Sequence, residues 1–149
     1  MGVPFEQLPT ILDRYSRGTS AAASRAVQKA ALAAGAEAVR ATRVDTGLAR
    51  SNWVARLDTA FIGEVAAYAP GHKLGKGETA NAAGAMAQQR SVIGRFNIGR
   101  NKKIHITNNV PYIGYLNDGS RTTTPDMMAR RAIQIAAATI RGTRILRKA

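Results

Sequence analysis

The first stretch of the chain that could do chemistry is rich in glycine and lysine: residues 71–77, with the sequence GHKLGKG. In a phosphate-binding loop, glycine amides and a lysine bind the phosphates of a nucleotide, and a following Ser or Thr binds magnesium. Here Gly77 stands where that hydroxyl is needed, the glycine spacing differs, and no buried strand precedes the stretch. The sequence therefore predicts a flexible basic loop at this place, not a nucleotide site.

Other residue types that carry catalysis are present but are not grouped. The two histidines, His72 and His105, stand far apart, and neither has a partner at a metal-ligand spacing. The nine carboxylates are scattered, and no serine lies in the turn that presents a hydrolase nucleophile. The absence of cysteine excludes disulfides, thiolate zinc sites and cysteine nucleophiles. The sequence predicts no catalytic residue, no metal site and no cofactor, and a protein that is not an enzyme.

Positive charge is the clearest chemical feature of the chain. The net charge is +13 at pH 7, and the isoelectric point is about 11.3. Such a charge attracts nucleic acid, acidic proteins or anionic membranes over long distances. No acidic residue lies between Thr79 and Asn117, although several basic residues do. The basic residues of this stretch and of the loop before it are Lys73, Lys76, Arg90, Arg95, Arg100, Lys102 and Lys103.

A second basic group lies near the end of the chain, where no acidic residue follows Arg130. In a helix, Arg130, Arg141, Arg144 and Lys148 fall on one face, because their spacings are close to whole turns. One interpretation is a solvated face, which is the usual role of a charged run. The other is a contact with a polyanion or with an acidic partner protein.

The elements that must position these residues begin with two predicted helices. Apolar residues of 5–16 recur at helical spacing and predict a short amphipathic helix, which Gly18 interrupts. A long alanine-rich helix then extends to about Arg43. Most residues on one side of this helix are small, and they form a stripe along it. Leu32 and Val39 fall outside that stripe, so they either border the core or contact an adjacent subunit.

The rest of the chain predicts an α+β fold, with a small, mainly antiparallel sheet packed by the long N-terminal helix and a C-terminal helix. Asp45 and Gly47 predict a turn after the first long helix, and Trp53 lies in the strand that follows. Strands are predicted at 49–57, 61–68, 103–107 and 112–116, a weak helix at 79–93, and a final helix from Thr124-Pro125-Asp126 to about residue 147.

We expect a single domain over residues 1–149. Its predicted parts are N-terminal helices at 5–43, strands within 44–69, a basic loop and helix insertion at 70–103, strands within 104–120, and a C-terminal helix at 124–147.

Composition limits how large a core this chain can build. The hydrophobic fraction is 45%, but alanine dominates it and alanine buries little apolar area. We therefore expect a thin core and a protomer that gains stability from neighbouring subunits. No segment reaches the roughly 18 apolar residues of a membrane span, and the N-terminus lacks a signal-peptide pattern, so we expect synthesis in the cytoplasm and no membrane partner.

Several short motifs occur in an order that resembles one protein family. They are Val44-Asp45-Thr46-Gly47, Ala49-Arg50-Ser51-Asn52-Trp53, Gly77-Glu78-Thr79-Ala80-Asn81, Ile106-Thr107-Asn108-Asn109-Val110-Pro111-Tyr112, Leu116-Asn117-Asp118-Gly119-Ser120 and Thr124-Pro125-Asp126-Met127-Met128. In this order they resemble the tail-completion or neck proteins of long-tailed bacteriophages, which join head to tail. Members of that family commonly carry an acid where this chain has Asn117.

The resemblance implies a structural protein of the virion, made in the host bacterium. It would form a homo-oligomeric ring at the neck, between the portal or adaptor and the tail tube or tail terminator. Genomic DNA passing through the ring would attract Arg130, Arg141, Arg144 and Lys148 regardless of its sequence; an acidic ring protein is the other candidate partner. The basic insertion would contact a subunit or the tail, either as a folded element or as a segment that orders on assembly.

Two alternatives remain beside the neck protein. A tail terminator sits close to the neck and does similar work. A sequence-independent nucleic-acid-binding module would share the charge, although the chain lacks the aromatic platform and the helix-turn-helix pattern of common modules.

Overall fold

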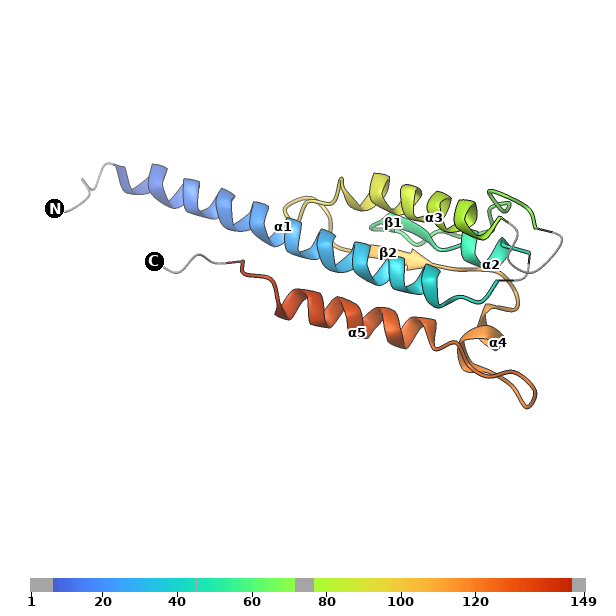
Figure 1. The fold of residues 1–149 in the computed structure, drawn as a ribbon. Helices are drawn as coiled ribbons and strands as arrows, with labels where there is room; N and C mark the ends of the chain where they lie inside the picture. The colour runs from blue at the N-terminus through green and yellow to red at the C-terminus, as the bar shows by residue number, and fades with distance from the viewer. Residues whose placement is uncertain (1–6, 45, 72–76, 146–149) are drawn as a thin grey trace.

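The computed structural model describes residues 7–44, 46–71 and 77–145, and its described part is α+β, as predicted (Figure 1). In chain order the elements are α1 (Leu8–Ala41), α2 (Leu48–Ser51), β1 (Val54–Leu57), α3 (Glu78–Ile93), β2 (Ile104–Thr107), α4 (Ile113–Asp118) and α5 (Met128–Arg141). Both α3 and α5 pack on α1 and run antiparallel to it, while β1 packs on α3 (Figure 1). The first turns of α1 project beyond both of these helices (Figure 1).

Helix α1 is continuous from Leu8 to Ala41, so the predicted interruption at Gly18 is wrong. A single glycine lowers helix stability by about 1 kcal/mol and does not end a helix on its own. The space around Gly18 is open, so no other element forces the chain to turn there. An ion pair between Asp13 and Arg17, one turn apart, supports the helix just before this position.

The sheet has only two strands in the described residues, and they are antiparallel. The register pairs Val54 with Thr107 and Ala55 with Ile106. Because side chains alternate along a strand, Ile104 and Ile106 lie on the same face as the buried Ala55. Strand β2 is therefore confirmed.

Two strand predictions are wrong and one is correct only in part. The strand predicted at 49–57 is confirmed over Val54–Leu57 as β1, but the segment starts as α2 and Trp53 comes just before β1. The segment 112–116 lies mostly in helix α4, and residues 61–68 form neither a strand nor a helix. Their backbone groups are bound by side-chain amides instead of by a neighbouring strand, as described below.

Helix α3 makes the predicted insertion part of the core. Asn81, Ala85, Gln89 and Ile93 recur every four residues and are all buried, so one face of α3 packs against α1 and β1. The weak helix predicted at 79–93 is therefore confirmed as α3. Its buried face was not predicted, because polar amides occupy half of the buried positions.

Helix α5 is shorter than predicted at both ends. It begins at Met128, not at Thr124, and it ends at Arg141, where Gly142 follows. Met128 is fully buried, whereas Ile133 and Ile140 are exposed. The core is thin, as expected: its largest fully buried apolar side chains are Ile93, Met128, Val39 and Val110.

Candidate functional site

The motifs that carry the resemblance meet at one end of the molecule, and Asn81 on α3 is their centre. Its Oδ1 accepts from Ser51 Oγ at 3.0 Å and from the Ala69 N–H at 2.7 Å, and its Nδ2 donates to the Ala69 carbonyl at 2.8 Å. The side chain is fully buried. Gly47 has φ +83°, and a Cβ there would collide with the Asn81 amide, so glycine is required on both counts.

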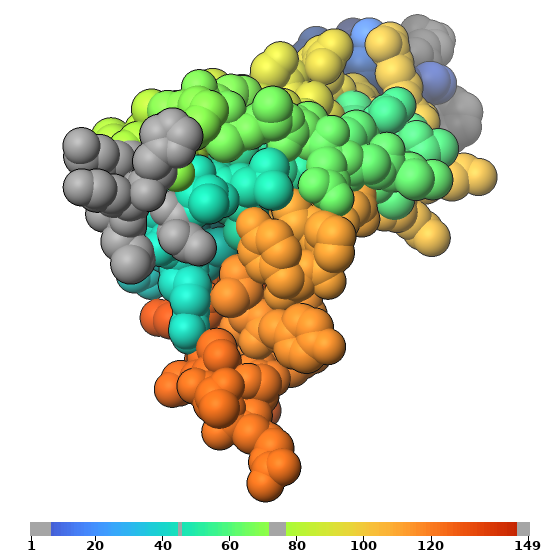
Figure 2. Space-filling model, turned by 90° about the vertical axis from the view of Figure 1, so that its right-hand side faces the viewer, coloured from blue at the N-terminus to red at the C-terminus, as the bar shows by residue number. Residues whose placement is uncertain are grey.

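Three more asparagines bind backbone that the sequence suggested would pair as a strand. Asn52 accepts from the Val65 N–H and donates to the Val65 carbonyl, both at 2.8 Å. Asn109 donates to the carbonyls of Phe61 and Gly63, at 2.9 and 3.1 Å, and Asn108 donates to the Ala49 carbonyl at 2.7 Å. Figure 2 shows this end, where the segments near residues 48 (cyan), 65 (green) and 112 (orange) adjoin.

Trp53 links the end of α1 to the rest of this framework. Its indole N–H donates to Thr42 Oγ1 at 2.7 Å, and that hydroxyl donates to the Ala38 carbonyl at 2.7 Å, beside the sulfur of Met128. Gln89 donates to the Trp53 carbonyl at 2.9 Å. Trp53 and Thr42 together thus connect the end of α1, the start of β1, α3 and the start of α5.

Arg50 adds a charged link to the same framework. This buried guanidinium donates to the Thr42 carbonyl, at 2.7 Å for Nη2, and forms an ion pair with Glu78 at the start of α3. The carboxylate at the N-terminus of α3 also suits the helix dipole.

Asn117 and Asp126 fix the entry to α5. Asn117 Oδ1 accepts from the Ala129 N–H at 3.0 Å, so it binds a free amide at the first turn of α5. Asp126 accepts from Arg43 in an ion pair of 2.6 Å, and this hydrogen bond raises the pKa of Arg43. Gly119 has φ +77° and leaves no room for a Cβ beside Pro125.

A groove of about 610 Å³ lies between these loops. Arg43, Leu48, Tyr112, Leu116 and Thr123 are among the residues that line it. Pro111 is exposed beside it, after the buried Val110. Asp45, which we expected to form a turn with Gly47 after the first long helix, lies outside the described residues.

The loop 94–103 after α3 presents basic side chains from a fixed backbone. Arg95, Arg100, Lys102 and Lys103 are exposed, and none forms an ion pair with another described residue. Two hydrogen bonds join Asn97 and Asn101 across this loop. The Asn97 N–H donates to Asn101 Oδ1 at 3.0 Å, and the Asn101 N–H donates to the Asn97 carbonyl at 2.7 Å.

The same loop is tied to α1 and to β1. Gln28 donates to the Phe96 carbonyl at 2.8 Å, and the Ile98 N–H donates to Ser24 Oγ at 3.0 Å. Asp58 accepts from Asn101 Nδ2 at 2.9 Å and from the Lys102 N–H at 2.6 Å, and these bonds hold the pKa of Asp58 below its ordinary value. This part of the insertion is folded within the protomer, so the interpretation of a segment that orders only on assembly does not apply to it.

The remaining predicted contact residues are placed as follows. Arg90 is exposed on α3, and Lys73 and Lys76 lie outside the described residues. Arg130 and Arg141 are exposed on α5, but Arg144 comes after the helix has ended and Lys148 is outside the described residues. Among the residues of the ridge that the structure describes, Arg130 and Arg141 therefore lie on the helix and Arg144 does not.

Leu32 and Val39 have different environments, although both were candidate subunit contacts. Val39 is 1% exposed and belongs to the protomer's own core, so that prediction is wrong for it. Leu32 is half-buried in a groove between α1 and α3, which Met86 and Gln89 also line. The buried Gly35, whose added Cβ would collide with Gln89, shows how closely the two helices approach.

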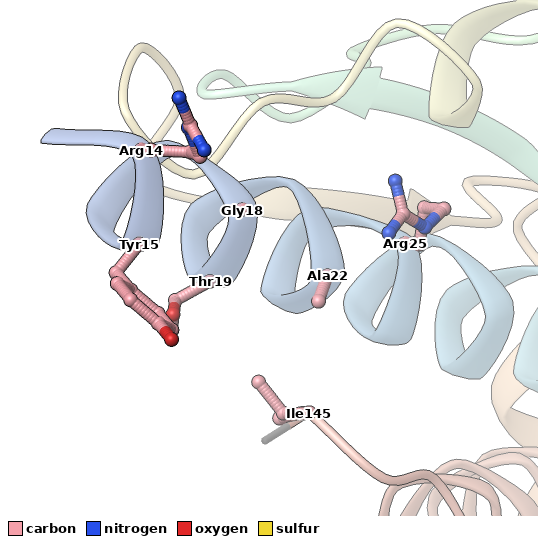
Figure 3. Close-up of a pocket in the computed structure, with 7 residues that line it drawn as sticks. All are labelled: Arg14, Tyr15, Gly18, Thr19, Ala22, Arg25 and Ile145. Atoms are coloured by element: carbon pink, nitrogen blue, oxygen red, sulfur yellow. The ribbon is translucent and has the colours of Figure 1, made fainter. Parts of the chain in front are cut away.

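Sequence reasoning missed an exposed apolar face on the first turns of α1, residues 8–22, which we call the arm. Leu8, Leu12 and Tyr15 are 40%, 59% and 72% exposed. The predicted amphipathic pattern was correct, but the pattern alone suggested burial. A shallow hollow of about 550 Å³ lies along this face, between the arm and Ile145 (Figure 3).

Among the described residues, no three His, Asp or Glu side chains lie close enough together to hold a metal ion. His105 makes a contact of 3.2 Å with the Asp58 carbonyl, and His72 lies outside the described residues. None of the described helices is both long enough and apolar enough to cross a membrane.

Comparisons with protein-family models, with characterised proteins and with solved structures found no match to this chain. The arrangement itself is suited to binding: a rigid end built by buried amides, a basic loop, and an apolar arm.

Proposed function

We propose that this chain is a structural protein of a tailed bacteriophage, which forms a ring at the neck between head and tail. One observation carries the proposal. The motifs that resemble the tail-completion family are spread from residue 44 to residue 128, yet several of their residues bond one another at one end of the fold. Ser51 bonds to Asn81, Arg50 forms an ion pair with Glu78, and the Asn108 side chain donates to the Ala49 carbonyl. Motif residues that bond to one another across the sequence support a fold shared with the tail-completion family better than isolated motifs do.

The surface of the protomer also supports assembly. Several large apolar side chains are exposed on α1 and α5, and apolar patches of this kind mark interaction sites. A ring of identical subunits would bury them through one repeated heterologous contact. The charge of +13 per chain would suit an assembly that surrounds DNA, because phosphates attract Lys and Arg regardless of base sequence.

The test is the mass and shape of the purified protein, by light scattering and negative-stain microscopy, at low and high salt. We expect annular particles that persist at high salt, since apolar contacts are not screened. A protein that stays monomeric at every salt concentration, and that binds one nucleic-acid sequence tightly at physiological salt, would contradict the proposal.

A neck protein and a tail terminator would both pass that test, so a second one separates them. Purified heads without tails and tails without heads would each be mixed with the protein. Binding to the portal or adaptor of heads supports the neck protein, whereas binding only to the open end of tails supports the terminator.

Sequence-independent nucleic-acid binding is a second candidate function, and the loop 94–103 favours it. Its four exposed cations stand on a backbone that Asp58, Ser24 and Gln28 hold in place, so little ordering is needed for them to meet phosphates. Binding to a DNA duplex should weaken steeply with salt. A variant with Arg100, Lys102 and Lys103 changed to Gln should have a shallower salt dependence; an unchanged slope would exclude this loop.

A further inference from the structure

The α1 arm has one apolar face, and that face continues the surface of α1 that the protein's own α5 covers. Leu8, Leu12, Tyr15, Thr19 and Ala22 follow one another at intervals of three or four residues, which places them on one side of the helix. The next residues of the same series are Ala26, Ala30, Ala33 and Glu37.

The later residues of this series, from Ala26 to Glu37, lie where α1 packs on α5. Ala26 and Ala30 are 2% and 3% exposed, and Glu37 forms an ion pair of 3.1 Å with Arg131 on α5. Because α5 ends at Arg141, the arm extends past it with the same face uncovered (Figure 1). Within the described residues, Ile145 alone approaches this face from the C-terminal segment (Figure 3).

The outward side of α5 carries a second uncovered apolar face. Ile133, Ala137 and Ile140 lie at i, i+4 and i+7, the spacing of Leu8, Leu12 and Tyr15. Ile133 is 69% exposed and Ile140 is 46% exposed. Ile133 also borders an apolar hollow between α1, α5 and the sheet, which Trp53 and Ile106 line.

We propose that the arm of one subunit packs against the outward face of α5 in a second copy of this chain. The inference rests on the proposed ring, and it specifies the interface. The same surface of α1 already packs on α5 within one chain, so a second copy of α5 is a helix of the kind that this surface contacts. Each copy would offer the arm once and the α5 face once, a heterologous contact that repeats around a ring.

An isolated helix of about 15 residues is only marginally stable in water. Contact with a neighbour over about four turns would therefore stabilise the arm as well as bury Leu12 and Tyr15. Large side chains are also what an interface needs, because aromatic and aliphatic anchors contribute most of the binding energy.

Charge predicts an unusual salt dependence for this contact. Arg14 and Arg25 line the hollow beside the apolar face of the arm (Figure 3), and Arg130 and Arg141 flank the α5 face. Both partners are therefore basic, and their repulsion weakens as salt screens it. Association through this interface should strengthen as salt rises, the reverse of an interface built from ion pairs.

Disulfide trapping can test the contact directly, because the chain has no cysteine of its own. Single variants Tyr15→Cys and Ile133→Cys would be mixed, oxidised at high salt, and assayed for cross-linked dimers containing one of each. The control pair is Tyr15→Cys with Ile62→Cys, since Ile62 is 91% exposed and not on α5. We expect at least about tenfold more cross-linking for the first pair, which corresponds to 1.4 kcal/mol of preference. Equal yields for the two pairs would overturn the proposal.

A double variant, Leu12→Ala with Tyr15→Ala, separates this interface from the ring itself. If the unmodified protein forms rings and this variant is at least tenfold weaker in assembly, both proposals stand. If the variant forms the same rings, the arm is not the interface and the ring proposal survives. If the unmodified protein stays monomeric at all salt concentrations, the arm contact fails, and the ring proposal fails with it if the protein also binds one nucleic-acid sequence tightly at physiological salt. Both substitutions are at exposed positions, so circular dichroism should show a folded protein with an unchanged melting temperature of the body.

Discussion

The two halves of α1 have the same secondary structure but opposite environments. Residues 24–41, which we call the body half, are held by α3, α5 and the framework around Trp53, and they include Ala30, Ala38 and Val39 in the core. The arm extends past α3 and α5 and is largely exposed. It nevertheless carries larger apolar side chains, Leu8, Leu12 and Tyr15. Small residues stand where the chain packs on itself, and large ones stand where it does not.

This difference separates folding from assembly along one helix. Alanine and glycine in the body half allow α3 and α5 to approach closely, as the contact between Gly35 and Gln89 requires. Large side chains in the arm would be a liability for a protein that worked alone. They are reasonable if a second chain covers them. The predictions below test each side of this comparison, beginning with the largest effect.

Removing the Asn81 side chain should damage the body most. Asn81→Ala would leave the part-buried N–H and carbonyl of Ala69 without their partners. Each stranded group costs roughly 1–3 kcal/mol, so we expect a loss of about 3 kcal/mol or more in the free energy of unfolding, measured by urea denaturation. Ser91→Ala, at an exposed position of the same helix, is the control and should change stability by less than about 0.5 kcal/mol. Equal effects would mean that the amide framework does not hold the body together.

Gly35→Ala should destabilise the body half by about 2 kcal/mol through overpacking. The new Cβ would collide with the Gln89 amide. That amide cannot simply move, because it is buried and donates to the Trp53 carbonyl at 2.9 Å. Thermal unfolding monitored by the fluorescence of the single Trp53 would report the change. A neutral result would show that α1 and α3 can separate without cost.

How much of this could be predicted from the sequence depends on how far apart the partners are. Local patterns identified α3, β2 and α5, because helical or alternating spacing is contained in the segment itself. The strand predicted over 61–68 failed because Asn52 and Asn109 bind that backbone from distant parts of the chain. Nothing within the segment distinguishes such partners from a neighbouring strand.

Of the two candidate interaction surfaces, the basic loop was predicted from the sequence and the exposed arm was not. The exposed cations of the loop 94–103 were expected from charge alone. The exposure of the arm was not, because Leu8, Leu12 and Tyr15 have the spacing of a buried face. Whether they are covered depends on where α5 stops, and that depends on Gly142 and the geometry of the whole helix pair.

Gly18→Ala should have the opposite sign to Gly35→Ala, although both change glycine to alanine in α1. Nothing lies within 4 Å of a Cβ at Gly18, so only helix propensity changes, and alanine is favoured by about 1 kcal/mol. The arm should become more helical, with its amide hydrogen exchange slowed by about fivefold. Exchange in the body half should be unchanged. A destabilised arm would mean that Gly18 has a role the open space around it does not suggest.

The border between the two halves is the place where the loop 94–103 reaches α1. Ser24 and Gln28 bind the loop from α1, and Asp58 binds it from the end of β1. Loosening this loop should therefore make the part of α1 around Ser24 and Gln28 less stable, as the arm is.

Acid should loosen this border, with the smallest effect of the series. Hydrogen bonds from Asn101 and from the Lys102 backbone hold the pKa of Asp58 below its ordinary value of 3.8. A lowered pKa means that the ionised carboxylate stabilises the fold above that ordinary value, and that this contribution is lost as the pH falls through the folded pKa. Asp58→Asn keeps a side chain that tolerates the positive φ of 64° at this position, but it removes the charge. We expect the variant to have a lower melting temperature than the parent at pH 7, and the gap to close below about pH 4. Asp13, whose pKa is also lowered by Arg17, is present in both proteins and cancels in the difference. A gap that is the same at pH 3 and pH 7 would show that the charge of Asp58 does not hold the loop.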